Sequence, residues 1–450
     1  MTAIVIVGAG PAGIAAASAL VEHGHRPVVI DEARQAGGQV YRRPSGPVAV
    51  DPRRMLGAQF GGYRRSHARW AALAERIDYR PETLAWNVAG GRVHALRAEV
   101  VDTVRCDALI LATGATDRLL PVEGWTAPGV FSLGAAQVLL KDQGCLIGRR
   151  TVFCGSSPLL YLAALQYAQA GGEVAAVLDT APASAKVASF SRLGAEPGLM
   201  LRGLRWIAAL RRLGVPIRLG VCPLRIESGA DGVRAIWFAG ARGPARMPCD
   251  AVALGFGLRA ETQLFELAGG RLRFDPAHRQ YLPEMDGDGR CGAGLYAAGD
   301  GSGIGGADAA EASGRLASLA LLADLGAMPD THEMARLRRH VARLRRFQRA
   351  LASAFPIPDW AAAAADGTVL CRCENISVGE VRRVLRGRLP PGDVNRAKAL
   401  TRCGMGRCQG RYCGLALAEL MAAETGTPLA RMGWLRTQAP VKPLPLASAP

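Results

Sequence analysis

Residues 3–32, AIVIVGAGPAGIAAASALVEHGHRPVVIDE, decide the fold of this chain. Residues 3–7 are small and β-branched apolar residues without alternation, which is typical of a strand buried on both faces of a parallel sheet. Residues 13–22 have the apolar period of a helix, and residues 27–30 form a second strand-like run. The stretch therefore predicts a complete β-α-β unit, the building block of an α/β fold with a parallel sheet.

The turn between the first strand and the helix has the glycine pattern of a dinucleotide site. Its residues are Gly8, Gly10, Pro11, Ala12 and Gly13. Glycines at the GxGxxG positions let the backbone approach a pyrophosphate, and the start of the helix offers free N–H groups and the positive end of its dipole. An acid about 20 residues further on accepts a hydrogen bond from a ribose 2′-OH. Asp31 and Glu32 both stand at that distance, and the choice between them stays open.

An imperfect second copy of the unit lies at an offset of 147 residues, where residues 151–179 predict strand, helix (about 158–169) and strand. The offset pairs Gly8 with Gly155, Gly10 with Ser157, Gly13 with Leu160, and Glu32 with Asp179. The second copy has lost two of the three glycines, including the one that permits close approach to a pyrophosphate. NAD(P) binding there is therefore doubtful. The repeat favours Glu32 as the ribose acid of the first unit, whereas the usual strand length favours Asp31.

Two later segments add to this pattern. Residues 108–114, ALILATG, predict a buried strand that ends in a Thr-Gly turn, and residues 294–300, GLYAAGD, predict another that ends in Gly-Asp. A glycine-rich stretch then leads into a helix over about residues 307–325. With these segments the chain resembles the two-dinucleotide-binding flavoproteins of the glutathione and thioredoxin reductase family.

This resemblance implies FAD on the first unit, with the late Gly-Asp motif holding the ribityl chain. Besides the glycine turn and the acid, it assigns to FAD the residues Gly38, Gln39, Thr113, Gly114, Gly299 and Asp300. Thioredoxin reductase-type proteins that act through a redox-active dithiol carry a CxxC beside the flavin, and this sequence contains no CxxC. Dithiol exchange is therefore excluded as the main chemistry.

Five cysteines fall in the last fifth of the chain: Cys371, Cys373, Cys403, Cys408 and Cys413. Their spacing offers two equal C-x4-C pairs, 403/408 and 408/413. A helix predicted to start near Tyr412 places Cys408 and Cys413 at its entry, where amide donors and the dipole stabilise an anionic cluster. We therefore interpret Cys403, which sits a loop earlier, as the spare thiol. By count, four thiolates suit a [2Fe–2S] cluster or zinc equally.

The segments CRCE (371–374) and TRCGMGRCQGRYC (401–413) resemble the [2Fe–2S] domain of the bacterioferritin-associated-ferredoxin type. The resemblance implies the ligands Cys371, Cys373, Cys408 and Cys413. Further motifs, such as ATGATDR at 112–118 and GAAQ at 134–137, extend a resemblance over nearly the whole chain to the α subunits of the family that contains opine oxidase, D-hydroxyproline dehydrogenase and hydrogen cyanide synthase.

That family resemblance implies a heteromeric amino-acid or amine dehydrogenase. A D-amino-acid-oxidase-like β subunit oxidises the substrate, which could be D-hydroxyproline, an opine, proline or glycine, and FMN can sit between the subunits. A small γ subunit is also compatible with the resemblance. This chain would pass electrons from the β subunit to an acceptor. The alternatives are a self-contained NAD(P)H:acceptor oxidoreductase and a redox-inert scaffold. No catalytic acid–base group is evident, because the seven histidines are dispersed.

These motifs predict two Rossmann-like domains, one inserted in the other, and a small α-rich cluster domain. The expected ranges are 1–118 with 258–330 for FAD, 119–257 for the NAD(P)-like domain, 331–360 for a linker helix, 361–437 for the [2Fe–2S] domain and 438–450 for a loose tail. No signal peptide or membrane span is predicted, so we expect a cytoplasmic protein, with peripheral membrane contact left open.

The net charge of +17 among 450 residues is the unusual feature of the composition. Residues 331–450 hold 20 Lys and Arg against 8 Asp and Glu, a net +12, which leaves +5 for the first 330 residues. The excess therefore belongs to the linker and the cluster domain. This placement favours an acidic partner subunit, or the phosphate of an interfacial flavin, over nucleic acid.

Overall fold

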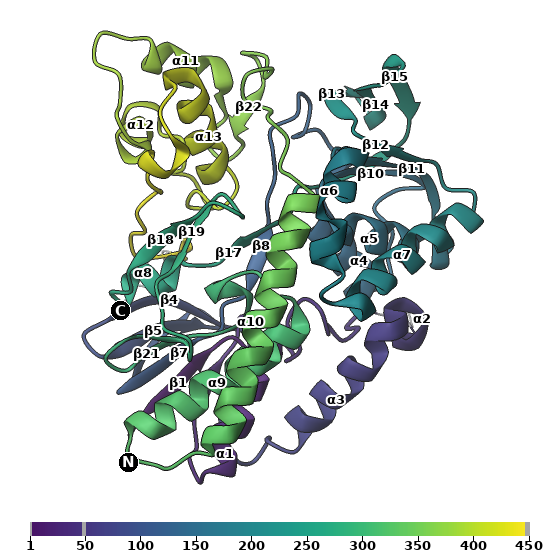
Figure 1. Ribbon diagram of the computed structural model, residues 1–450. Helices are drawn as coiled ribbons and strands as arrows, with labels where there is room; N and C mark the ends of the chain where they lie inside the picture. The colour runs from purple at the N-terminus through teal and green to yellow at the C-terminus, as the bar shows by residue number, and fades with distance from the viewer. Residues whose placement is uncertain (1, 47–50, 446–450) are drawn as a thin grey trace.

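The computed structural model describes residues 2–46 and 51–445, and Figure 1 shows how they are arranged. One parallel sheet lies at the lower left of the view and a second at the right, and a small helical part that contains the cysteines lies above the first sheet. The long helix α10 (Thr331–Ala354) runs between the two sheets. The predicted α/β class, with two Rossmann-like units, is confirmed.

The first sheet has six strands in the order β20-β21-β7-β1-β2-β3. Strand β1 pairs in parallel with β2 and with β7, so the chain reverses its winding at β1, where nucleotide sites form in such sheets. Helices α1 and α9 pack together on one face. The bounds are β1 Ile4–Val7, α1 Pro11–Glu22, β2 Val28–Ile30, β3 Asp78–Arg80, β7 Ala108–Leu111, β20 Arg290–Gly292, β21 Leu295–Ala297 and α9 Ala307–Asp324.

The second sheet has five strands in the order β12-β11-β10-β16-β9. Its bounds are β9 Val130–Ser132, β10 Arg150–Gly155, β11 Glu173–Asp179, β12 Ile217–Leu219 and β16 Ala251–Gly255, and helix α5 covers Pro158–Gln169. The register of β10 against β11 shifts by one residue between Thr151 and Val152. In the first sheet, Val7 pairs with Ile30, which puts Gly8 level with Asp31, and in the second sheet Gly155 pairs with Asp179. The counterpart of Asp179 is therefore Asp31.

The remaining strands form small antiparallel sheets, and of the other helices α4 packs on the second sheet while α2 and α7 pack on α5. Three-stranded sheets comprise β4 Thr83–Ala89, β5 Arg92–Arg97 and β6 Val100–Arg105, and β13 Cys222–Gly229, β14 Gly232–Gly240 and β15 Gly243–Pro248. Two-stranded sheets comprise β8 Ala115–Asp117 with β17 Leu258–Ala260, and β18 Leu272–Asp275 with β19 Gln280–Pro283. The other helices are α2 Pro52–Leu56, α3 Phe60–Ala71, α4 Leu133–Gln143, α6 Ala183–Leu193, α7 Pro197–Arg212 and α8 Gln263–Leu267.

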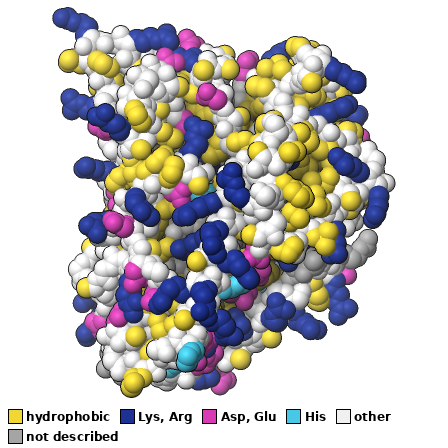
Figure 2. Space-filling model, in the orientation of Figure 1, with side chains coloured by type: hydrophobic (Ala, Val, Ile, Leu, Met, Phe, Trp, Pro, Cys, Tyr) yellow, Lys and Arg dark blue, Asp and Glu magenta, His cyan; other side chains and the backbone are white. Residues whose placement is uncertain are grey.

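Helix α10 is buried along one stripe and basic along the other. Val341, Leu344 and Phe347 face inward, and the helix packs on α9 and α6. Figure 2 shows Lys and Arg side chains gathered down the middle of the face, over α10. The helix is thus a packed connection with a solvated basic face.

The cysteine part is built on a short sheet and three helices. These are β22 Val369–Cys371, β23 Ile376–Ser377, α11 Val378–Leu385, α12 Val394–Thr401 and α13 Gly414–Thr425. Ser377 and Glu380 form the capping box that the sequence predicts at the start of α11. Part of the predicted loose tail is packed instead: Val441 is buried, and its N–H bonds the Trp86 carbonyl at 3.0 Å. Residues 446–450 of that tail lie outside the described residues.

A buried ion pair ties the cysteine part to the nucleotide-binding part. The Arg118 guanidinium donates to the Glu419 carboxylate of α13 at 2.7 Å, and both side chains are only 2% exposed. Arg279 lies 2.9 Å from the same carboxylate, and the Trp360 indole also donates to it. Burial lowers the pKa of Arg118. One carboxylate therefore compensates two guanidinium groups at this junction.

We expect Glu419→Gln to destabilise the protein by about 3 kcal/mol, because removing one partner leaves a buried charge uncompensated. Chemical denaturation followed by circular dichroism measures this change. The matched control is Glu173→Gln, which breaks the exposed pair with Arg150 and should have little effect. Equal effects of the two substitutions would contradict the role assigned to Glu419.

Candidate functional site: a flavin cradle beside a cysteine cluster

The glycine turn after β1 is shaped by close backbone contacts. A Cβ on Gly13 would lie 1.7 Å from the Gly8 carbonyl oxygen, and one on Gly8, where φ is +107°, would lie 2.3 Å from the Ala112 carbonyl oxygen. Gly10 is different, because a Cβ there would meet only the Gly38 Cα, at 3.7 Å. Gly10 and Gly38 thus approach each other backbone to backbone at the start of α1, and neither puts a side chain over the turn. A bare glycine backbone at the start of a helix suits a pyrophosphate.

The two candidate ribose acids occupy different environments. Asp31 accepts hydrogen bonds from the N–H groups of Ala9 and Ala33, so its carboxylate lies at the glycine turn. Burial raises the pKa of Asp31. Glu32 is exposed and pairs with Lys442. The strand register also makes Asp31 the counterpart of Asp179. Both observations favour Asp31 over Glu32 as the ribose acid.

The other positions assigned to FAD surround the same end of the sheet. A Cβ on Gly301 would lie 2.7 Å from Thr113 Oγ1, so the turn after β7 touches the turn after β21. Asp300 accepts bonds from the N–H groups of Gly305 and Gly306 through Oδ1 only. Oδ2 accepts none from the described residues and is free for a hydroxyl donor, as a ribityl chain requires. Burial raises the pKa of Asp300.

The remaining assigned positions complete this edge of the sheet. Pro11 and Ala12 begin α1, and a Cβ on Gly299 would lie 2.9 Å from that of Ala12. Gly114 accepts a hydrogen bond from the Glu261 N–H. Gln39 is exposed and accepts from Arg42, so its side chain is not drawn into the cradle. The residues present therefore fit FAD, with Gln39 contributing least.

The second nucleotide turn is closed by the protein itself. Asp179, the counterpart of the ribose acid, is 0% exposed and accepts bonds from the Tyr161 hydroxyl and from Lys186 Nζ at 2.8 Å. The segment after α10 covers the turn: Ser156 donates to the Pro356 carbonyl at 2.8 Å, and the Phe355 ring lies 4.7 Å from Lys186 Nζ. No carboxylate is left to bind a ribose at this described turn.

The five C-terminal cysteines converge. The Sγ atoms of Cys371, Cys403 and Cys413 lie within 4.8 Å of one another, and all three residues are buried. Cys408 lies beside them, because the neighbouring Cys413 thiol, with a smaller contribution from the exposed Cys373, lowers the pKa of Cys408. The closest group of thiols thus holds two of the four predicted ligands, Cys371 and Cys413, together with Cys403, which the sequence marks as the spare thiol. Such a set of thiols can hold an iron–sulfur cluster or zinc.

Spacing alone could not have shown the position of Cys403. Helix α12 ends at Thr401, and the next residue, Arg402, has a φ of +65° that turns the chain back toward the other thiols. The Cys403 N–H then bonds Thr401 Oγ1 at 3.1 Å, which holds the turn. Gly406 allows the loop to close, because a Cβ there would lie 2.4 Å from that of Cys373. The spacing of cysteines along the sequence does not indicate whether the residue before one of them has a left-handed backbone conformation.

Glu261 joins the flavin turn to the cysteine loop. Its carbonyl accepts from Thr113 Oγ1 at 2.6 Å. Its carboxylate accepts from Arg411 Nε at 3.0 Å, and Arg411 also donates to the Cys408 carbonyl at 3.2 Å. Burial by itself would raise the pKa of Glu261, but the positive charges of Arg259 and Arg411 outweigh this effect and lower that pKa. Sequence reasoning did not find this residue, because its partners lie about 150 positions away on either side.

Comparison with known proteins agrees with this geometry. Residues 2–314 match the family described as "Pyridine nucleotide-disulphide oxidoreductase". The chain belongs to that family. It is an oxidoreductase of flavoprotein type, and the family supports FAD as its flavin.

Curated relatives extend over the whole chain. One subunit of the opine oxidase of Rhizobium meliloti is 37% identical over 99% of this chain and 86% of the relative. The HcnB subunit of hydrogen cyanide synthase from Pseudomonas aeruginosa is 32% identical over 99% of this chain and 97% of the relative. Both relatives are named as subunits of larger enzymes. The resemblance to this family is therefore confirmed.

Solved structures confirm the fold. L-proline dehydrogenase from P. horikoshii superposes with a TM-score of 0.72 at 21% identity, over 99% of this chain and 79% of that chain. Thioredoxin reductase of T. acidophilum has a TM-score of 0.53 at 20% identity, over 72% of this chain and 98% of that chain. Among the described residues, no helix combines the length and the apolar character needed to cross a bilayer.

We expect Asp31→Asn to weaken FAD binding about 10- to 100-fold, because it removes a charged acceptor for the ribose. The measurement is the flavin content of the purified protein, followed by titration of the flavin-free form with FAD. Glu32→Gln is the matched control and should bind FAD normally. A larger loss in Glu32→Gln would return the ribose role to Glu32.

Proposed function

We propose that this chain is the FAD- and [2Fe–2S]-containing electron-transfer (α) subunit of a heteromeric amino-acid or amine dehydrogenase. The observation that carries the proposal is the contrast between the two nucleotide turns. The turn at Gly10 keeps its glycine backbone bare of side chains, whereas the turn at Ser156 is covered by Phe355 and Pro356. This contrast supports an electron source other than NAD(P)H.

Each cofactor would be held by residues already described. The turn at Gly10, with Asp31 and Asp300, would bind FAD, and Cys371, Cys373, Cys408 and Cys413 would bind the cluster. When bound, FAD exchanges two electrons in single steps and a [2Fe–2S] cluster carries one. The chain's own contribution is to fix the two cofactor regions relative to each other through Glu261 and Arg411.

The electron donor in this proposal is a β subunit of the D-amino-acid-oxidase type. The family relatives support it, because their names describe subunits of opine oxidase and hydrogen cyanide synthase. The exposed basic face of α10 supports an acidic partner. Proline, D-hydroxyproline, opines and glycine are the substrate candidates, and the partner selects among them. A cytoplasmic location belongs to the same proposal.

We expect NADH to leave the flavin of the purified chain oxidised under anaerobic conditions, because Asp179 is buried and already bonded. Absorbance of the flavin during titration measures this. The positive control is the chain copurified with its flavin-containing partner, whose flavin absorbance should bleach when the correct amino acid or opine is added. Fast stoichiometric bleaching by NADH would instead support a self-contained NAD(P)H:acceptor oxidoreductase. A preparation without flavin, iron or sulfide would support the scaffold alternative.

We expect Cys408→Ser to abolish the visible absorption and the iron and sulfide content of the cluster, because it removes a proposed ligand. Cys403→Ser is the matched control in the same loop and should retain both. The reverse result would overturn the ligand assignment and make Cys403 a ligand. Zinc without sulfide in the wild-type protein would instead show that the cysteines form a zinc site and not a [2Fe–2S] cluster.

A further inference from the structure

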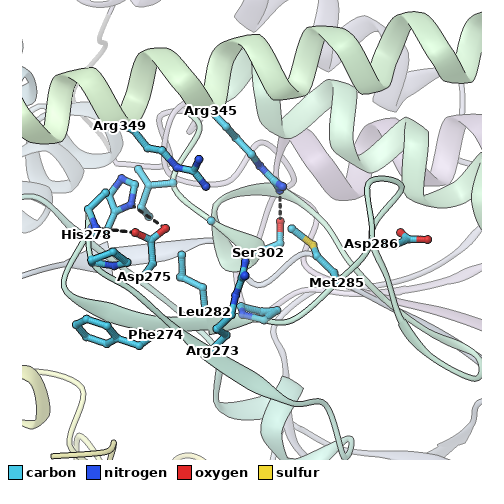
Figure 3. A pocket seen from close by; sticks show the side chains of 15 residues that line it. Arg273, Phe274, Asp275, His278, Leu282, Met285, Asp286, Ser302, Arg345 and Arg349 are labelled. Atoms are coloured by element: carbon cyan, nitrogen blue, oxygen red, sulfur yellow. Dashed lines mark hydrogen bonds and ion pairs between the residues drawn. The ribbon is translucent and has the colours of Figure 1, made fainter. Parts of the chain in front are cut away.

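A cavity of about 470 Å³ opens beside α10, next to the segment that follows the flavin cradle. Its other walls come from the β18–β19 hairpin and from the segment that follows Asp300 (Figure 3). Arg345 and Arg349 project into it from successive turns of α10, and Arg273 points toward them from β18. Three guanidinium groups from two separate elements therefore share one cavity.

No carboxylate forms an ion pair with these three cations in the part of the chain that the structure describes, although the buried Asp300 attracts Arg345. Arg345 donates only to Ser302 Oγ, at 3.0 Å, and burial lowers the pKa of Arg345. Arg345 and Arg349 repel each other, since like charges four residues apart on a helix are neighbours. Arg345 is half-buried, whereas Arg273 and Arg349 are exposed, and an anion among them would relieve this repulsion and accept hydrogen bonds from the guanidinium groups.

The carboxylates in the cavity wall are already engaged. Asp275 accepts from the N–H groups of Ala277 and His278 and pairs with the His278 ring, which lowers the pKa of Asp275 to about 2. Asp286 pairs with Arg290, which lies outside the cavity. Neither acid neutralises the three arginines. The cavity keeps an excess positive charge that matches a dianion.

The rest of the wall is apolar. Leu282, Pro283, Met285 and Ile304 line it beside the arginines. Small-molecule sites combine such apolar walls with a few converging polar groups, and guanidinium forks bind phosphate oxygens in pairs. We propose that this cavity binds a small phosphate monoester, with its phosphate held among Arg273, Arg345 and Arg349 and its organic part against the apolar wall.

The test is isothermal titration calorimetry on the full chain with its bound cofactors, at fixed low salt. The probes are two pairs that differ only by the phosphate: ribose 5-phosphate with ribose, and FMN with riboflavin. We expect the phosphorylated member of a pair to bind and its partner to fail. Arg349→Gln and Arg273→Gln should each weaken binding about tenfold, because each removes a charged hydrogen-bond donor.

Arg346→Gln is the matched control, since Arg346 is exposed on the same helix and does not line the cavity. It should leave the affinity unchanged. Unfolding temperatures of all variants establish that each is folded. Tighter binding of FMN than of ribose 5-phosphate identifies a flavin mononucleotide as the source of the phosphate, and the opposite order identifies a sugar phosphate. Absence of binding by both phosphate esters, or equal weakening by Arg346→Gln and Arg349→Gln, would overturn the proposal.

Discussion

The position of Glu261 between two cofactor regions is the constraint on which the rest of the structure depends. Its backbone bonds the turn at Thr113, and its carboxylate bonds Arg411, which lies between two of the clustered cysteines. The buried pair of Arg118 and Glu419 joins the same two parts at a second point. Two separate polar junctions prevent the cysteine part from rotating as an independent domain. The distance between the flavin cradle and the thiols is therefore a property of the fold.

Helix α10 connects three features that lie far apart in the sequence. Its inner stripe packs on the first nucleotide-binding unit, and its outer face carries the exposed arginines. Its C-terminal continuation, Phe355 and Pro356, covers the second nucleotide turn. Arg345 and Arg349 on the same helix line the cavity beside the flavin cradle. One element thus covers the second nucleotide turn, carries the exposed arginines and lines the cavity.

The sequence predicted what depends on neighbours along the chain. Helix α5 covers residues 158–169, as its apolar pattern indicates, and the capping box at Ser377 is present. Two assignments depended on geometry that spacing does not encode. A one-residue register shift at Thr151 made a constant offset align Asp179 with Glu32, and a left-handed Arg402 brings Cys403 next to Cys371 and Cys413. The contacts of Glu261 and the cover over Ser156 join distant residues, so no local pattern indicated them.

The central claim is that electrons pass between the flavin and the cysteine-bound cluster within this one chain. Anaerobic photoreduction of the purified chain, followed by electron paramagnetic resonance at low temperature, tests it most directly. We predict that the signal of a reduced [2Fe–2S] cluster develops together with flavin reduction and reaches about one spin per chain. A fully reduced flavin beside an iron–sulfur cluster that stays oxidised, or the absence of any such cluster, would contradict the account.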